Sequence, residues 1–227
     1  MHRIPKILHQ THKTGELPVS CQGYVERLKR LHPGWAYHFY DDEACGRLIT
    51  NEMPTLLPLY RQPDLLPVQR ADIFRLVVVY LRGGFYLDID MDMHRALDDL
   101  LDFGAVFAIE LLLTEERCRE LHHDDAVRIG NYAFGAEPGH PFLKHLIHAL
   151  VLGAHAFAPP ETEHELLEQT GPGFVTTQYH RYMRSNPDGD IHLLGLAQRL
   201  CGVCRGQCCQ FGEYASHKHM GSWRWES

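Results

Sequence analysis

The sequence has no apolar run long enough to cross a membrane. Its longest runs in 227 residues, such as residues 76–81, are far shorter than the ~20 apolar residues that a transmembrane helix requires. The first residues also lack the continuous apolar core of a secretory signal peptide. We therefore expect no transmembrane segment and a cytoplasmic location.

The sequence also lacks any run of Lys and Arg. It has 22 basic and 29 acidic side chains, for a formal net charge of −7. A chain of this charge does not favour a nucleic acid as partner, because the phosphate backbone is held by clustered cations. The apolar fraction of 44% predicts a folded chain, and no repeat or linker divides it. We expect one domain, residues 1–227.

No Walker loop is present, and Gly171-Pro172-Gly173 lacks the third glycine of a dinucleotide-binding turn. Strand patterns nevertheless alternate with helical ones along the chain. Strands are expected at residues 4–9, 35–40, 85–89 and 105–109, and helices at 19–31, 70–82 and 142–152. Residues 43–59 look helical but are interrupted by Pro54 and Pro58. This alternation predicts an α/β fold with a mainly parallel sheet, in which ligands bind beyond the carboxyl ends of the strands.

An acidic segment follows the third expected strand. Strand alternation would place Asp88, Asp90 and Asp92 on one side, where their carboxylates repel each other unless a cation compensates them. Hard divalent ions such as Mg²⁺ or Mn²⁺ bind oxygen ligands and complete their shells with substrate phosphates. A solvated acidic loop without a metal is the alternative interpretation.

Two charged residues, Asp72 and Arg75, lie three apart on the helix before this strand, and therefore on one face. Taken alone, they favour an exposed ion pair. An Arg and a carboxylate that point together into a polar cleft would instead bind sugar hydroxyls and phosphate oxygens.

Residues 70–90 combine these features in one ordered pattern: A-D-x-x-R, a tyrosine, G-G, then Y-x-D-x-D. The pattern resembles the core of the DXD sugar-binding glycosyltransferases, glycosyltransferase family 32. Residues 4–11 resemble the opening strand of that family, and His217 and Gly221-Ser222-Trp223 resemble its terminal motif. The usual tryptophan after Gln-Thr is replaced by His12.

The resemblance implies a single GT-A type domain, a UDP- or GDP-sugar donor, Mn²⁺ or Mg²⁺, and retention of anomeric configuration. The acceptor would be a glycan, a lipid-linked intermediate or a protein. By the same resemblance, the residues that hold the sugar and support transfer are Asp72, Arg75, Asp88 and Asp90. Those that border the nucleotide are His9, Gln10, Thr11, Tyr86, Asp88, Asn131, Ser222 and Trp223, and those near the metal are Asp88, Asp90, His217 and Ser222.

Two other functions remain open at this stage. A haloacid-dehalogenase-like phosphatase also uses a strand that ends in Asp-x-Asp, although it would not explain Asp72 and Arg75. A sugar- or zinc-binding module without catalytic activity is the second.

Four of the seven cysteines crowd into nine residues. Cys201, Cys204, Cys208 and Cys209 offer four thiolates for a structural Zn²⁺. They lack the paired spacing of a zinc knuckle, so thiols without a metal are the alternative.

Overall fold

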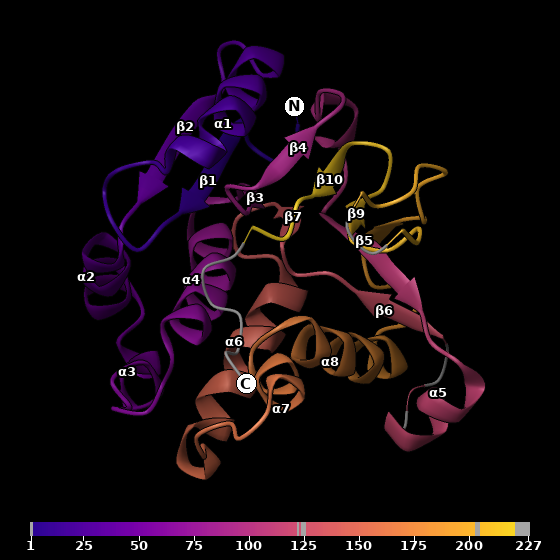
Figure 1. The fold of residues 1–227 in the computed structure, drawn as a ribbon. Coiled ribbons are helices and arrows are strands. Elements are labelled where there is room, and N and C mark those ends of the chain that lie inside the picture. Colours follow the sequence, from indigo (N-terminus) through magenta and orange to yellow (C-terminus); the bar gives the residue numbers. More distant parts are fainter. Residues whose placement is uncertain (1, 122, 124–125, 203–204, 221–227) are drawn as a thin grey trace.

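A mixed sheet forms the centre of the structure, a computed structural model that describes residues 2–121, 123, 126–202 and 205–220 (Figure 1). Its strands occur in the order β2 (Ala36–Tyr40), β1 (Ile7–Thr11), β3 (Gly84–Leu87), β7 (Ala133–Ala136), β5 (Ala105–Leu112) and β6 (Val127–Ile129). An additional strand, β8 (Ile191–Leu194), pairs with β5.

Most strands of this sheet run in one direction. β1 is parallel to both β2 and β3, and β8 is parallel to β5. β7 is antiparallel to β3 and to β5, and β6 is antiparallel to β5. Among the described strands, β6 and β7 therefore run against the other five. The α/β fold with a mainly parallel sheet flanked by helices is confirmed.

One face of the sheet is covered by four helices: α2 (Asp42–Glu52), α4 (Pro67–Arg82), α6 (Pro141–Gly153) and α8 (Pro172–Ser185). Their buried side chains form one hydrophobic cluster with Tyr86, Phe107 and Phe134 of the sheet. Four short helical elements join this side, namely a 3₁₀ turn at Pro54–Leu56, α3 (Leu57–Tyr60), a 3₁₀ turn at Ala154–Ala156 and α7 (Glu163–Gln169).

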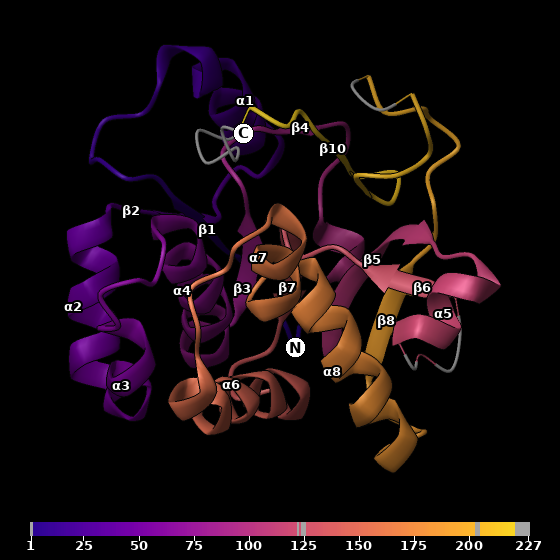
Figure 2. The ribbon, with the colours of Figure 1, turned by 60° about the horizontal axis from the view of Figure 1, so that its bottom comes forward.

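The opposite face is covered by α1 (Val19–Leu31) and a small antiparallel sheet of β4 (Met91–Met93), β10 (Ala215–His217) and β9 (Gln210–Phe211). A second hydrophobic cluster on this face includes Phe85, Leu87 and Val106. Successive side chains of a strand point to opposite faces, so these neighbours of Tyr86 and Phe107 lie on the other side of the sheet. Figure 2 shows α1 and β4 above the sheet and α6 and α8 below it. The two remaining elements are a 3₁₀ turn at Asp98–Leu100 and α5 (Glu115–Leu121).

The turn from α4 into β3 needs two glycines. Gly83 has φ +66° and Gly84 has φ +90°, both in the region that side chains other than glycine rarely adopt. A Cβ atom at Gly84 would lie 2.5 Å from the backbone oxygen of Ile7. The two glycines therefore allow β3 to lie directly against β1, so that the end of β3 is fixed relative to the end of β1.

The structure corrects two strand boundaries. The first strand begins at Ile7, because the chain turns where the Ile7 N–H donates to the carbonyl of Pro5 over 2.8 Å. The third strand ends at Leu87, because the Met91 N–H donates to the carbonyl of Asp88 over 3.1 Å and closes a turn. The helix at Val19–Leu31 is confirmed. No helix among the described residues is long and apolar enough to cross a membrane.

Candidate active site

The turn after β3 decides which acids come together. Asp88 and Asp90 lie on either side of it, and their carboxylates approach the same point. Asp92 does not join them. It forms ion pairs of 3.0 Å with Arg27 of α1 and with Lys218. The expected convergence of three carboxylates is therefore wrong for Asp92, because a turn interrupts the alternation on which it depended.

His217, at the end of β10, completes this acidic group. Its Nε2 lies 3.2 Å from Asp90 Oδ1 and 4.0 Å from Asp88 Oδ2. Ligand atoms of the three side chains all lie within 4.8 Å of one another. This set combines two carboxylates with an imidazole, which suits Mn²⁺ or Mg²⁺. The Nδ1 atom of His217 is buried without a hydrogen-bond partner among the described residues.

His217 and Asp90 each favour the charged form of the other. Burial alone would lower the pKa of His217, but the hydrogen bond and charge of Asp90 raise it above its usual value. Burial likewise opposes ionisation of Asp90, yet the His217 contact and the Met220 N–H lower the pKa of Asp90. That N–H donates to Asp90 Oδ2 over 2.8 Å. A cation at this point would displace the proton of His217.

Arg75 lies next to the acidic group and joins it to α4. Its guanidinium is 3.2 Å from Asp88 Oδ1 and 3.3 Å from Asp72 Oδ1, with the side chain only 7% exposed. It also donates to the backbone oxygen of Asn131 over 3.0 Å, and it packs on the ring of Tyr86 at 4.8 Å. The sequence alone favoured an exposed pair for Asp72 and Arg75. The structure instead buries both.

Asp72 is held by two neutral hydrogen-bond donors as well as by Arg75. Asn131 Nδ2 and Thr170 Oγ1 donate to its two oxygens, each over 2.9 Å. Burial raises the pKa of Asp72 to about 6, although Arg75 and both hydrogen bonds oppose the shift. Thr170 was not predicted from the sequence. The only feature that could have indicated a role for it is its place directly before Gly171-Pro172, where α8 begins.

The end of β1 supports Asp88 from a third direction. Gln10 Nε2 donates to the backbone oxygen of Asp88 over 3.2 Å. The hydroxyl of Thr11 lies 3.0 Å from that of Tyr86, which donates to Asp88 Oδ1 over 2.8 Å. Burial raises the pKa of the Asp88 carboxyl, against the effect of Arg75. The structure thus brings Gln10, Thr11 and Tyr86 into the candidate site.

His9 does not join these residues. It is fully buried, and its ring nitrogens lie 2.9 Å from the backbone oxygen of Gly83 and 3.2 Å from the hydroxyl of Tyr40. Burial lowers the pKa of His9 to about 4, so the ring is neutral near pH 7. These contacts assign it a structural role at the α4–β3 turn. The other two expected residues, Ser222 and Trp223, lie outside the described residues.

The cysteine segment differs from its prediction. Cys208 is disulfide-bonded, so four thiolates cannot bind one Zn²⁺ as expected, and Cys204 lies outside the described residues. Cys201 and Cys209 approach each other, together with His219. Burial and the charge of Glu110 together raise the pKa of the Cys209 thiol to about 12.

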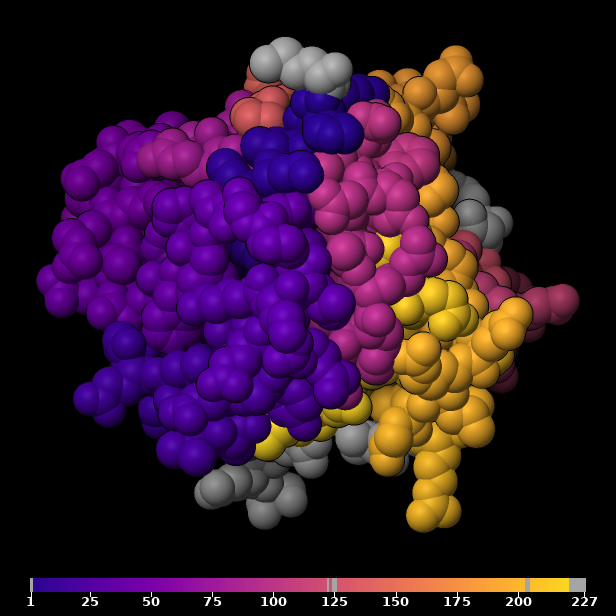
Figure 3. Space-filling model, turned by 90° about the horizontal axis from the view of Figure 1, so that it is seen from above, coloured from indigo at the N-terminus to yellow at the C-terminus, as the bar shows by residue number. Residues whose placement is uncertain are grey.

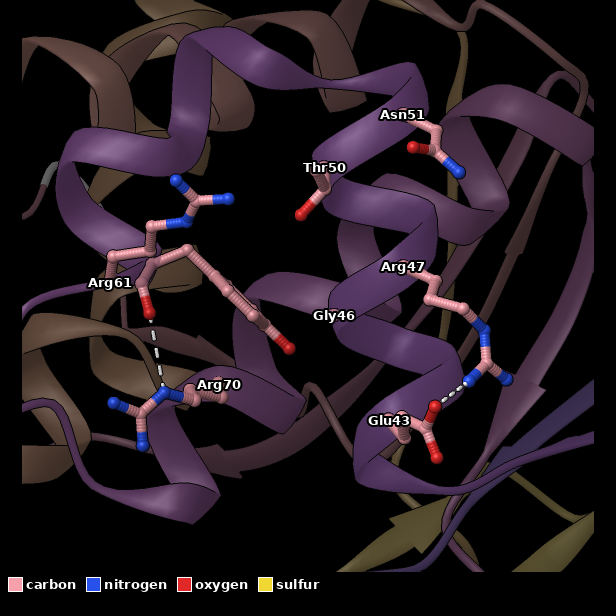
Figure 4. A pocket seen from close by; sticks show the side chains of 8 residues that line it. Glu43, Gly46, Arg47, Thr50, Asn51, Arg61 and Arg70 are labelled. Atoms are coloured by element: carbon pink, nitrogen blue, oxygen red, sulfur yellow. Dashed lines mark hydrogen bonds and ion pairs between the residues drawn. The ribbon is translucent and has the colours of Figure 1, made fainter.

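A cavity of about 540 Å³ lies elsewhere, between α2 and the start of α4. Arg47, Arg61 and Arg70 are among its lining residues. Figure 4 shows Arg47 beside Glu43, and Arg70 donating to a backbone oxygen, that of Tyr60. None of the predicted site residues lines this cavity.

The acidic turn lies between segments from the two halves of the chain. Figure 3 shows the surface of residues near 90–100 between the early residues and the late ones near 200–220. β4 follows the acidic turn and pairs with β10, which carries His217. The small sheet therefore brings a histidine from the end of the described chain to the acids near its middle.

The sequence profile of the family described as "glycosyltransferase sugar-binding region containing DXD motif" matches residues 18–106. This range includes Asp72 and Arg75 as well as both acids of the turn, Asp88 and Asp90. The chain thus matches this DXD glycosyltransferase family in the segment that carries these residues. The likeness to glycosyltransferase family 32 that the sequence indicated is confirmed.

Two curated relatives of this chain are named as a mannosyltransferase and as a glycosyltransferase. It is 31% identical to inositol phosphoceramide mannosyltransferase 2 of Schizosaccharomyces pombe over 82% of this chain and 49% of the relative. It is 24% identical to an uncharacterized glycosyltransferase, L373, of Acanthamoeba polyphaga mimivirus over 97% of this chain and 84% of the relative. The chain spans about half the length of the first of these relatives.

A solved structure supports the fold. The PaToxG glycosyltransferase superposes with a TM-score of 0.57 at 15% identity, over 80% of this chain and 70% of that one. At this identity the likeness concerns the fold alone. The family match includes Asp72 and Arg75, which the phosphatase alternative does not explain.

Proposed function

We propose that this chain, acting as one GT-A domain, transfers a hexosyl group from a UDP- or GDP-sugar to an acceptor in a metal-dependent reaction that retains anomeric configuration. One observation carries the proposal: the Asp88–Asp90–His217 group lies directly beside the buried Asp72–Arg75 pair, with Arg75 in contact with both. The first group is suited to a cation and the second to the polar groups of a sugar phosphate.

Asp88, Asp90 and His217 would hold the Mn²⁺ or Mg²⁺. When bound there, such an ion neutralises the negative charge that develops on a departing diphosphate, which is worth several kcal/mol of barrier. The fit rests on the donor set and on the distances among its ligand atoms. An acidic turn can in this way bind an anionic donor, because the cation inverts the sign of the local field.

The protein's own side chains would orient the donor. Arg75 offers a buried cation fixed by two carboxylates and by the Asn131 carbonyl, so that little reorganisation is needed to contact a phosphate. Asp72 would accept hydrogen bonds from sugar hydroxyls, with Thr170 fixing its carboxylate. Thr11 and Tyr86 would line the nucleotide side. The proposal names no covalent nucleophile, since front-side attack also retains configuration.

The names of the relatives suggest which substrates to test first. The relative from Schizosaccharomyces pombe is called an inositol phosphoceramide mannosyltransferase. We therefore give GDP-mannose priority among the donors, followed by UDP-hexoses, and inositol phosphoceramide priority among the acceptors. Glycans and proteins are the other acceptor classes.

A donor screen tests this function. Purified protein is mixed with GDP- and UDP-sugars, with Mn²⁺, with Mg²⁺ or with a chelator, and release of GDP or UDP is followed. We expect release with one donor class that stops on chelation. The Asp90→Asn variant should lose this release, whereas Asp102→Asn, which changes a side chain that is 82% exposed, should keep it.

Three outcomes would contradict the proposal. Full turnover by Asp90→Asn in Mn²⁺ would remove the metal assignment. Hydrolysis of phosphate monoesters without sugar transfer would favour the phosphatase alternative. Binding of a sugar or nucleotide sugar without turnover under any condition would favour the module without catalytic activity.

A further inference from the structure

A second group of metal-binding side chains lies outside the acidic site. Cys201, Cys209 and His219 each offer one ligand atom, and these atoms all lie within 4.8 Å of one another. Cys201 is 2% exposed, and the other two side chains are partly buried. Three such atoms at this spacing match the separations between neighbouring ligands of a tetrahedral metal.

The chemistry of the three ligands differs from that of the acidic site. Two sulfurs and an imidazole are borderline-soft ligands that favour Zn²⁺, whereas carboxylates favour Mg²⁺ and Mn²⁺. The two groups can therefore select different ions, although His217 and His219 belong to the same short segment. Their rings lie 4.4 Å apart between centroids.

The backbone around these ligands adopts conformations that are unfavourable for residues other than glycine. Among the described residues, the non-glycine positions with left-handed φ are Arg205, Cys209 and His219, at 59°, 62° and 53°. Such a conformation costs roughly 1–2 kcal/mol per residue. Two of the three positions are candidate ligands, and the third lies in the turn that Cys201 opens, where the Arg205 N–H donates to the Cys201 oxygen over 3.0 Å.

We propose that Cys201, Cys209 and His219 bind one Zn²⁺. A water molecule completes the tetrahedron, as in other zinc sites with three protein ligands. Binding converts both thiols to thiolates, so two protons leave for solvent as two Zn–S bonds and one Zn–N bond form. No oxidant or reductant takes part. The proposal does not depend on the transfer reaction.

The metal would fasten the segment that supplies His217. The backbone N–H of His217 donates to the oxygen of Cys209 over 3.0 Å, and the backbone N–H of Cys209 donates to the oxygen of Glu110 in β5 over 3.3 Å. Zinc between Cys201, Cys209 and His219 would thus hold the chain on both sides of His217. It would act as a structural clamp next to the acidic site.

Metal analysis of the full chain tests this proposal directly. The protein is purified without added zinc, without chelator and without an affinity tag rich in histidine, and its metal content is measured by mass spectrometry. We expect about one zinc per chain. Cys201→Ser and Cys209→Ser should each lose this zinc. Cys118→Ser, which changes a thiol in α5, should keep it.

Substitution with Co²⁺ tests the site in the wild-type protein, so the result does not depend on whether a cysteine variant folds. Replacing zinc by Co²⁺ in the wild-type protein should produce the intense visible absorption of a tetrahedral site, with a thiolate-to-cobalt charge-transfer band. The Asp90→Asn variant should show the same spectrum, because its change lies in the acidic site. Asp90→Asn should lose donor turnover but keep the cobalt spectrum, so the zinc proposal and the proposed transfer reaction are tested separately.

Several results would overturn the proposal. The first is that wild-type protein contains no zinc and gives no thiolate band with Co²⁺. The second is that Cys209→Ser keeps its full zinc content. The third is that Asp90→Asn loses its zinc. Peptide mapping that finds Cys201 and Cys209 joined in a disulfide in freshly purified, metal-free protein would also overturn it. Such a bond would use the two thiols that the metal requires.

Discussion

Replacement of Arg75 by Met tests whether the buried charges of the candidate site depend on one cation. The substitution keeps most of the apolar side-chain stem and removes the guanidinium. It leaves Asp72 and Asp88 without the cation that lies 3.3 Å and 3.2 Å from their oxygens. It also removes the hydrogen bond to the Asn131 carbonyl.

The expected cost follows from burial. Asp72 and Arg75 are each 7% exposed at the side chain. Removing one partner of such a buried pair costs about 3–5 kcal/mol in free energy of unfolding, because a buried charge is left uncompensated. The matched control is Arg82→Met in the same helix. That side chain is 43% exposed in its pair with Glu52, so the expected loss is about 0–1 kcal/mol.

The loss should depend on pH in a defined direction. Arg75 lowers the pKa values of both Asp72 and Asp88, against burial, which raises them. Without Arg75 both values rise further, so the folded variant binds more protons than the unfolded chain at mildly acidic pH. Its stability relative to wild type should therefore improve as the pH falls from 8 to 5, a range that spans the wild-type pKa of about 6 for Asp72.

The assay is urea unfolding of wild type, Arg75→Met and Arg82→Met, followed by circular dichroism at several pH values. Each curve gives a free energy of unfolding and a slope, and the slopes should agree if the unfolded states are alike. Two results would refute the reasoning: a loss below about 1 kcal/mol for Arg75→Met at pH 8, the size typical of exposed pairs, or a loss that is the same at pH 5 as at pH 8.

Three further predictions concern other parts of the fold. Gly84→Ala should lower the free energy of unfolding in urea by more than about 2 kcal/mol, because φ is +90° and the Cβ would meet the Ile7 oxygen. Gly23→Ala, which has open space in α1, should stabilise the protein by up to about 1 kcal/mol in the same assay. Burial raises the pKa of Asp72 to about 6, so its neutral form contributes stability below the unfolded value of 3.8 that is lost as the pH rises through 6. Urea unfolding should show wild type losing about 2 kcal/mol relative to Asp72→Asn between pH 4 and 7, and a parallel pH dependence would contradict this. His217→Ala should weaken Mn²⁺ binding in calorimetry at least about tenfold, whereas His155→Ala should not, and equal affinities would exclude His217 as a ligand.

Those parts of the fold and of the candidate site that depend on residues close together in the sequence could be predicted. The segment from α4 to the acidic turn is local: a helical face with Asp72 and Arg75, a glycine pair that stops the helix, and a short buried strand. Each of these follows from spacing or from the allowed conformations of glycine. The order of helix, turn and strand was therefore predictable, whereas the burial of Arg75 between Asp72 and Asp88 was not.

The remaining parts depend on contacts between distant segments. Asp92 has the same spacing as Asp88 and Asp90, but it is drawn away by Arg27 and Lys218. Thr170 binds Asp72 across 98 residues. No local pattern encodes either contact, because the choice among competing charged and polar partners is made only when helices and strands pack together.

The contact between Met220 and Asp90 has a consequence for the newly made chain. These two residues are 130 positions apart, so at ~5–20 residues per second the ribosome needs about 6 to 26 seconds to pass from one to the other. During that interval the acids of the turn have already emerged, but His217 has not been made. Every strand of the large sheet precedes His217 in the sequence. The acidic site is therefore completed only after every described strand of the large sheet has been synthesised, and a chain that has not yet reached His217 has only a partial set of ligands with which to bind a metal ion.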